Sequence, residues 1–221
     1  TPSRTLVWRF HTVPRDGEPG HDTWEPGSSR DRTGVNVWSM MTVDVEHGLV
    51  FLPLGSAASD FYGGDRKGAN LYANSIVALD ATTGRLRWHR QLVHHDIWDY
   101  DVASPPALVT IRRGGRAIPA VVALTKSGLM FLFDRLTGEP LFPIEERPMP
   151  PSHVPGEESW PTQPYPVKPA PLSRHTAISA NDLTDVTPES RAFCSKLFAR
   201  FSVSGGAYTP SDTALVLWFP G

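Results

Sequence analysis

The sequence has a single cysteine, Cys194, no long apolar run and no excess of positive charge. One cysteine excludes an internal disulfide framework. No stretch approaches the roughly 20 apolar residues that a membrane-spanning helix needs. The 221 residues carry 21 basic and 23 acidic side chains, a formal net charge of −2, so neither a nucleic-acid surface nor a polybasic membrane patch is expected. With 40% hydrophobic and 20% charged residues, the composition is globular rather than disordered.

The chain also lacks an initiator methionine and a signal peptide at its start, which reads Thr-Pro-Ser-Arg. What it has in excess are turn-forming residues and tryptophan, with 22 Pro, 18 Gly and 7 Trp. This mixture favours an aromatic-rich all-β fold in which many short strands are joined by tight turns.

Four short apolar runs, each bounded by glycine or polar turn residues, predict buried β-strands. They are residues 49–54, 75–80, 120–125 and 128–134. A buried helix is possible for any one run alone, but the regular turns between the runs argue against helices for all of them. A final strand is predicted at residues 214–219.

A hairpin motif occurs twice. Residues 80–84 and 134–138 both read Asp-x-x-Thr-Gly, and each is followed by an aromatic residue, Trp88 or Phe142. The glycine supplies the positive φ of the turn, and the aspartate can bond nearby backbone amides. Trp8 is expected to end an earlier copy. A hairpin that recurs at this spacing is typical of the four-stranded blades of a β-propeller, although two unrelated hairpins would look the same.

Residues 143–171 are rich in proline and cannot form a central strand, because proline donates no ladder hydrogen bond. We expect an ordered loop that packs its aromatic residues on a surface. A helix is predicted after this segment, with Thr187 as its N-cap. Phe193, Leu197 and Phe201 fall on one face of that helix, and they are expected to pack in the core together with the lone cysteine.

One stretch concentrates reactive side chains. Residues 94–101 read His-His-Asp-Ile-Trp-Asp-Tyr-Asp, and groups of this kind are costly to bury without partners. The candidate roles are a transition-metal site at His94, His95 and Asp96, a Ca²⁺ site, or a general base beside a hard cation. No His-x-x-x-His, Cys-x-x-Cys or EF-hand spacing accompanies the stretch. From spacing alone, a polar loop at a blade edge explains it equally well.

Residues 94–99, preceded by the Asp-x-x-Thr-Gly-x-x-x-Trp hairpin and followed by residues 126–134, resemble the quinoprotein dehydrogenases, which use pyrroloquinoline quinone (PQQ). The hairpin resembles the tryptophan-docking motif that locks neighbouring blades of the family's eight-bladed propeller. Further segments follow the family's order and look closest to its membrane-type glucose dehydrogenase branch. These are residues 34–38, 52–55, 62–65, 160–164 and 219–221.

The resemblance covers nearly the whole chain and implies an all-β fold, a partial β-propeller of about three to four four-stranded blades out of eight. Residues 1–221 would form this one domain, with residues 143–200 as a Pro-rich excursion plus one short helix. Eight blades of roughly 50 residues exceed the length of this chain, so a central fragment of the ring is expected. A fragment of this kind can carry the catalytic residue and still be inactive alone.

Residue by residue, the resemblance implies PQQ-dependent oxidation of a sugar or alcohol hydroxyl, with a glucose-type substrate favoured. Asp99 matches the catalytic carboxylate, a general base that takes the hydroxyl proton while hydride passes to C5 of PQQ. Lys126 matches the basic residue beside the C4 and C5 oxygens of the cofactor, and Trp38 matches the indole that lies flat under it. Without the resemblance, Trp38 would be read as blade packing and Lys126 as a turn lysine.

The resemblance also implies a Ca²⁺ or Mg²⁺ ion that bridges PQQ and the protein, with Asp99 as a ligand. Where the alcohol-oxidising branch has asparagine, this sequence has Ser56, so Ser56 and the nearby Asp60 are the candidates for a further ligand. The implied partners are a sugar or alcohol substrate, a quinone or cytochrome that accepts electrons, and the remainder of the propeller, with no nucleic acid. The family works in the periplasm, and any membrane association would come from regions outside this chain.

A protein of a different class, a non-enzymatic propeller scaffold that binds protein partners, would also contain the repeated hairpins. It does not explain why Asp99, Trp38 and Lys126 occur together. A hydrolase that uses one of the two adjacent histidines as a base lacks a recognisable nucleophile elbow.

Overall fold

The computed structural model describes residues 5–37, 39–201 and 203–220. In chain order the strands are β1 (Thr42–Asp44), β2 (Leu49–Pro53), β3 (Ser75–Asp80), β4 (Leu86–Gln91), β5 (Ala107–Arg113), β6 (Arg116–Leu124), β7 (Met130–Asp134), β8 (Ile144–Pro148), β9 (Thr162–Pro166), β10 (Val203–Gly205) and β11 (Val216–Trp218). The helical elements are α1 (Pro188–Phe198) and two short 3-10 turns, His21–Thr23 and Ala180–Asp182. Among the described residues, no helix combines the length and the apolar composition that crossing a membrane requires.

The first two sheets are antiparallel meanders. Strands β1 to β4 form a four-stranded sheet in chain order, and β5 to β7 form a three-stranded sheet, which a bridge between Phe133 and Pro140 extends beyond β7. The four predicted apolar runs are β2, β3, the second half of β6, and β7. The remaining sheets have two strands each, β8 with β9 antiparallel and β10 with β11 parallel. The partial propeller is confirmed, with one complete four-stranded blade among the described residues.

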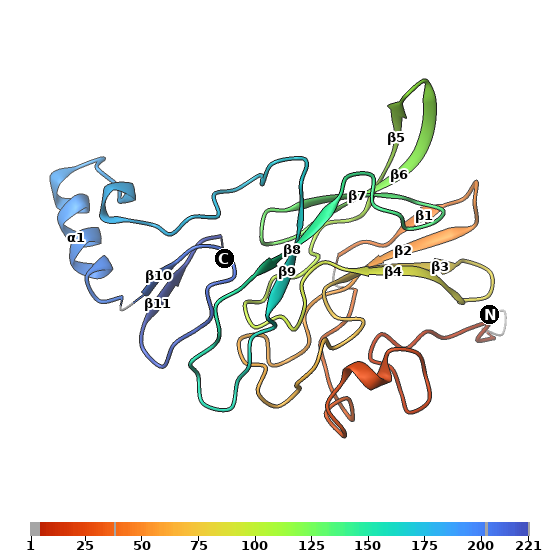
Figure 1. Cartoon of the computed structure of the whole chain (residues 1–221), viewed down its shortest axis with the longest axis horizontal. Coiled ribbons are helices and arrows are strands. Elements are labelled where there is room, and N and C mark those ends of the chain that lie inside the picture. Colours follow the sequence, from red (N-terminus) through yellow and green to blue (C-terminus); the bar gives the residue numbers. More distant parts are fainter. Residues whose placement is uncertain (1–4, 38, 202, 221) are drawn as a thin grey trace.

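One repeated hairpin docks the second meander on the first, and the other docks the N-terminal segment on the first meander. Figure 1 shows the two meanders side by side. A side chain at Gly84 would overlap the Trp8 ring, and a Cβ at Gly138 would lie 2.6 Å from the Trp88 ring. Each indole Nε1 also donates to the carbonyl of the residue that follows the motif aspartate, at 3.1 Å in both copies. The same contact therefore occurs twice, which confirms that each tryptophan docks on the next hairpin along the chain.

The core has two parts, one on each face of the first sheet. Leu49 and Phe51 of β2 pack with Phe131 and other residues of the second meander. Val50 and Leu52 face the opposite way, onto a cluster that includes Trp24 from the N-terminal segment. Because both faces are covered, β2 is apolar at every position rather than at alternate ones.

The C-terminal third differs from the sequence prediction in two respects. Residues 143–171 contain the β8–β9 hairpin rather than a continuous loop, and a two-stranded sheet tolerates proline because neither strand is central. Thr187 caps α1 as predicted, but the predicted core packing of the helix is wrong, since Phe193 is 69% exposed and Leu197 is 39% exposed. The physical reason is position, because α1 lies at the far end of the molecule from the two meanders (Figure 1). Cys194 is half-buried and free.

Candidate active site

Two connections bring the predicted catalytic residues together. Residues 94–101 lie between β4 and β5, which places the motif in the connection from the first meander to the second. Lys126 lies in the tight turn between β6 and β7. The Lys126 amide donates to the backbone carbonyl of Asp101 at 3.0 Å, so the turn and the motif are held against each other.

The side chain of Lys126 lies between two carboxylates. Its Nζ is 2.8 Å from Oδ2 of Asp99 and 2.5 Å from Oδ2 of Asp101. The Asp99 side chain is 30% exposed, whereas that of Asp101 is 5% exposed. The sequence predicted Asp99 and Lys126, and the structure brings them together. It missed Asp101 as a second partner of the lysine, and the available signal was an acidic residue two places further along the same motif.

Burial raises the pKa of Asp99 to about 6, Lys126 opposes this change, and the nearby charge of Asp101 adds to it. Burial alone would lower the pKa of Lys126, but its hydrogen bonds with Asp101 and Asp99 outweigh burial and raise that pKa. Asp99 is therefore mostly ionised at neutral pH and is still a stronger base than a solvent-exposed aspartate. Both properties suit a general base, whose best pKa lies near the working pH.

Asp99 and Asp101 open onto a cavity of about 360 Å³. Its other lining residues are Gly34, Asn36, Gly55, Ser56, Ala58 and Asp60. This volume lies within the usual range of small-molecule sites, roughly 300–1,000 Å³. A bridge pairs Gly34 with Ala57, so the segment that leads to Trp38 runs beside the cavity. Trp38 itself lies outside the described residues.

The atoms around this cavity suit a hard cation. The carboxylates of Asp99 and Asp101 and the oxygens of the uncharged polar residues provide oxygen donors, and no histidine or cysteine is among the lining residues. The Ser56 hydroxyl donates to Asp96 and accepts from Nδ2 of Asn74 at 3.0 Å, so two of its hydrogen-bonding positions are already used. The donor set fits Ca²⁺ or Mg²⁺ held by Asp99, and Ser56 as a ligand stays a prediction.

The two adjacent histidines point elsewhere. The His94 ring contacts Oε1 of Gln91 at 2.8 Å and Oε1 of Glu146 at 3.1 Å. His95 is buried and bonds the carbonyl of Gly68 at 2.8 Å, and burial lowers its pKa to about 4. Neither ring lines the cavity. The contacts of both histidines hold the loop in place, as expected for a polar loop at a blade edge.

A group of possible metal ligands lies elsewhere in the described part of the chain. Asp44, Glu46 and His47 gather their ligand atoms within 4.8 Å, but the buried Asp44 is already paired with His47 and with Arg135. These residues lie outside the lining of the Asp99 cavity.

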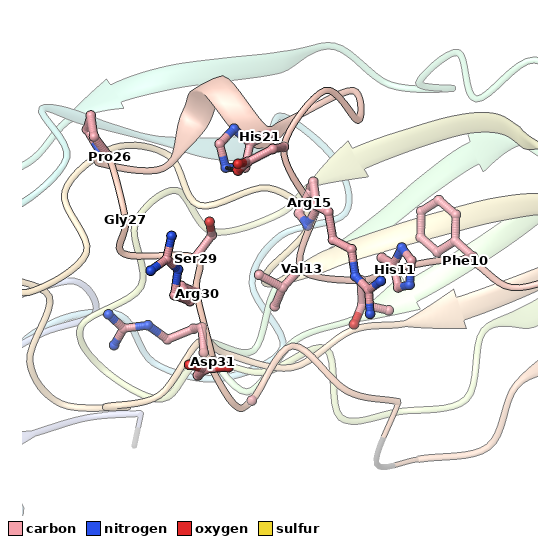
Figure 2. A pocket seen from close by; sticks show the side chains of 15 residues that line it. Phe10, His11, Val13, Arg15, His21, Pro26, Gly27, Ser29, Arg30 and Asp31 are labelled. Atoms are coloured by element: carbon pink, nitrogen blue, oxygen red, sulfur yellow. Dashed lines mark ion pairs between the residues drawn. The ribbon is translucent and has the colours of Figure 1, made fainter.

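A second cavity, about 1,000 Å³, lies in the N-terminal segment, with Arg15 and His11 on one side and Arg30 on the other (Figure 2). Its histidines are paired with acids, His11 with Glu18 and His21 with Asp16. It shares Gly34 with the smaller cavity, but neither Asp99 nor Lys126 lines it.

Comparisons with known proteins identify the family. The family model "PQQ: Glucose/ethanol/alcohol dehydrogenase, beta-propeller domain" matches residues 3–221. The chain is 37% identical over 218 residues to the quinate/shikimate dehydrogenase (quinone) of Acinetobacter baylyi, covering 98% of this chain and 26% of that protein. It is 36% identical over 221 residues to the quinoprotein glucose dehydrogenase of Gluconobacter oxydans, covering 97% of this chain and 26% of that protein.

A solved structure, a quinohemoprotein alcohol dehydrogenase from Pseudomonas putida HK5, superposes with a TM-score of 0.56 at 28% identity. The match covers 65% of this chain and 24% of that structure. The chain thus spans about a quarter of the length of these relatives. Because the family model matches residues 3–221 and the relatives match nearly the whole chain, the chain belongs to the β-propeller family of PQQ-dependent glucose, ethanol and alcohol dehydrogenases.

Proposed function

We propose that this chain provides the catalytic base and the cofactor-facing lysine for PQQ-dependent oxidation of a sugar or alcohol hydroxyl. The observation that carries the proposal is the contact of Lys126 Nζ with Asp99 Oδ2 at 2.8 Å, at the edge of a cavity that Asp99 lines. Oxidation of a hydroxyl needs a base that takes the proton and a cation that stabilises negative charge on the acceptor of the hydride. Asp99 and Lys126 provide these two groups beside a cavity of ligand size.

PQQ, when bound, supplies the quinone that accepts a hydride from the substrate carbon. Asp99 takes the hydroxyl proton on its carboxylate, and the O–H electron pair left behind forms the C=O bond. The C–H electron pair leaves with the hydride, so the substrate becomes a carbonyl compound. Protonation of Asp99 weakens its ion pair with Lys126. Asp101 still holds the lysine at 2.5 Å, so a cation stays in place to stabilise negative charge on the cofactor oxygens.

A Ca²⁺ or Mg²⁺ ion would be held by Asp99, with Asp101 close enough to share it. A cation at this point favours the ionised form of Asp99 and so offsets the rise in pKa that burial causes. Three carboxylates, those of Asp99, Asp101 and Asp60, line the cavity, and this supports the assignment.

For the substrate we propose a polyhydroxylated alcohol, with glucose as one candidate. The relatives named above act on quinate or shikimate and on glucose, and this chain is almost equally similar to both. Their shared chemistry is a ring that carries several hydroxyl groups. The name of the quinate relative also supports a quinone as the electron acceptor.

The test uses the protein at its full natural length, loaded with PQQ and Ca²⁺, and a dye-linked assay with glucose, quinate and glycerol. We expect turnover that requires PQQ and that Asp99→Asn lowers by roughly 10²–10⁴-fold, the usual contribution of a general base, while PQQ still binds. Asp185→Asn, the same change at an exposed aspartate, is the matched control and should behave like the unaltered protein. Full turnover by Asp99→Asn would refute the proposal. A folded protein that does not bind PQQ would instead favour the scaffold.

A further inference from the structure

The buried carboxylate of Asp96 binds the turn that carries Asp99. Its Oδ1 accepts from the backbone amide of Trp98 at 3.0 Å, and its Oδ2 accepts from the amide of Tyr100 at 2.7 Å. These two amides flank Asp99 in the chain. Asp99 has a φ of +61°, a left-handed conformation that residues other than glycine seldom adopt without support from their surroundings. Asp96 supplies that support from both sides.

Asp96 is in turn fixed to the first meander. The hydroxyl of Ser56 and Nδ2 of Asn74, the latter at 2.8 Å, both donate to its Oδ2. Both donors lie in the connection between β2 and β3. Asn74 also donates to the carbonyl of Tyr100 at 3.2 Å, so the far side of the Asp99 turn is tied to the same connection. The position of Asp99 is therefore set by the first sheet and not only by its own loop.

The chemistry of this contact requires a carboxylate. Four donors converge on Asp96, and an ionised carboxylate is the side chain of this size that accepts from all of them. The side chain of Arg66, which is fully buried, donates to the carbonyl of Asp96 and provides a positive charge nearby. An asparagine at position 96 would direct an N–H group at another N–H group in either orientation of its amide.

We propose that Asp96 is a positioning residue for oxidation at this site, holding Asp99 at the orientation in which its carboxylate reaches both Lys126 and the cavity. The inference rests on the proposed function, because it assigns Asp96 a role that acts through Asp99. A residue that only stabilises the fold would change the amount of folded protein and leave the rate per loaded site unchanged. A positioning residue changes that rate.

The experiment measures kcat and KM per bound PQQ in the full-length protein, together with PQQ affinity from tryptophan quenching. For Asp96→Asn we expect a kcat about 100-fold lower, as for a base displaced by about 1 Å, with KM and PQQ affinity within threefold of the unaltered protein. The double variant Asp96→Asn with Asp99→Asn should be no more than threefold slower than Asp99→Asn alone, because one change acts through the other.

A milder pair of variants decides the question if Asp96→Asn does not fold. Asn74 and Asn70 are both fully buried and left-handed, with φ of +51° and +57°, so glycine suits the backbone at either position. Asn74→Gly removes a donor to Asp96 and should lower kcat about tenfold. Asn70→Gly removes bonds to Arg66 and His95 but leaves all four donors to the Asp96 carboxylate in place, so it should leave kcat per loaded site unchanged.

Three results would overturn the inference. One is a kcat for Asp96→Asn within threefold of the unaltered protein, and another is a double variant whose two losses multiply. The third is equal kcat values for Asn74→Gly and Asn70→Gly. Failure of the proposed function looks different, because Asp99→Asn would then turn over normally, and that result would refute both proposals. An inactive Asp99→Asn beside a fully active Asp96→Asn would refute the positioning role alone.

Discussion

Replacing Gly138 with alanine should destabilise the protein far more than the same change at Gly115. Both glycines are left-handed, with φ of +74° and +75°. A Cβ at Gly138 would lie 2.6 Å from the Trp88 ring, whereas a Cβ at Gly115 has no neighbour within 4 Å. The two substitutions therefore share the backbone strain and differ in the contact with the docked tryptophan.

The left-handed conformation costs an alanine roughly 1–2 kcal/mol at either position. Forcing the Trp88 ring away adds about 1–3 kcal/mol of packing strain. Losing the bond from its Nε1 to the carbonyl of Arg135, 3.1 Å long, adds about 1 kcal/mol. Gly138→Ala should thus lower the free energy of unfolding by roughly 3–6 kcal/mol, and Gly115→Ala by only about 1–2 kcal/mol.

Urea titration followed by tryptophan fluorescence measures both values in the full chain. Equal losses in the two variants would refute the reasoning, because the tryptophan contact would then contribute nothing. Gly84→Ala repeats the test at the other hairpin, where the added methyl group would meet Trp8, and it should resemble Gly138→Ala.

Three further predictions concern charge and exposure. Burial lowers the pKa of His95 from 6.5 to about 4, so the unfolded chain binds the extra proton first and the protein loses stability as the pH drops from 6.5 towards 4. His95→Gln should remove up to roughly 3 kcal/mol of that loss, measured by urea titration at each pH. An unchanged dependence of stability on pH would contradict this. Lys126→Gln leaves Asp99 and Asp101 without their shared cation, so the pKa of Asp99 should rise further. The acidic limb of the plot of kcat/KM against pH should then move to higher pH, whereas Lys126→Arg should leave that limb close to its original position. Phe193→Ser should change the unfolding free energy by less than about 0.5 kcal/mol because the side chain is 69% exposed, and a loss above about 2 kcal/mol would show that α1 is packed after all.

The strands and the docked hairpins could be predicted because their signals are local. Both faces of the first sheet are covered, so β2 and β3 are continuous apolar runs between turns. The hairpin glycines are needed for a positive φ and for the close approach of an indole. Each of these requirements is visible within a few residues of sequence.

The site depended on contacts that no local pattern specifies. Asp99 and Lys126 lie on different connections and meet because the two meanders are docked, so the pairing was available only through resemblance to a family. Asp101 as the second partner of the lysine was missed for the same reason. The apolar face of α1 showed that a helix would form but not what would cover it, and the structure leaves that face exposed.

The most direct test of the account is a single-turnover measurement on Asp99→Asn loaded with PQQ. Substrate is mixed rapidly with the loaded full-length protein, without an electron acceptor, and the absorbance of the cofactor is followed. We predict that the unaltered protein shows the spectral change of cofactor reduction and that Asp99→Asn, with PQQ bound equally tightly, keeps the oxidised spectrum over the same time. Reduction of the cofactor in Asp99→Asn at the rate of the unaltered protein would contradict the assignment of Asp99 as the base.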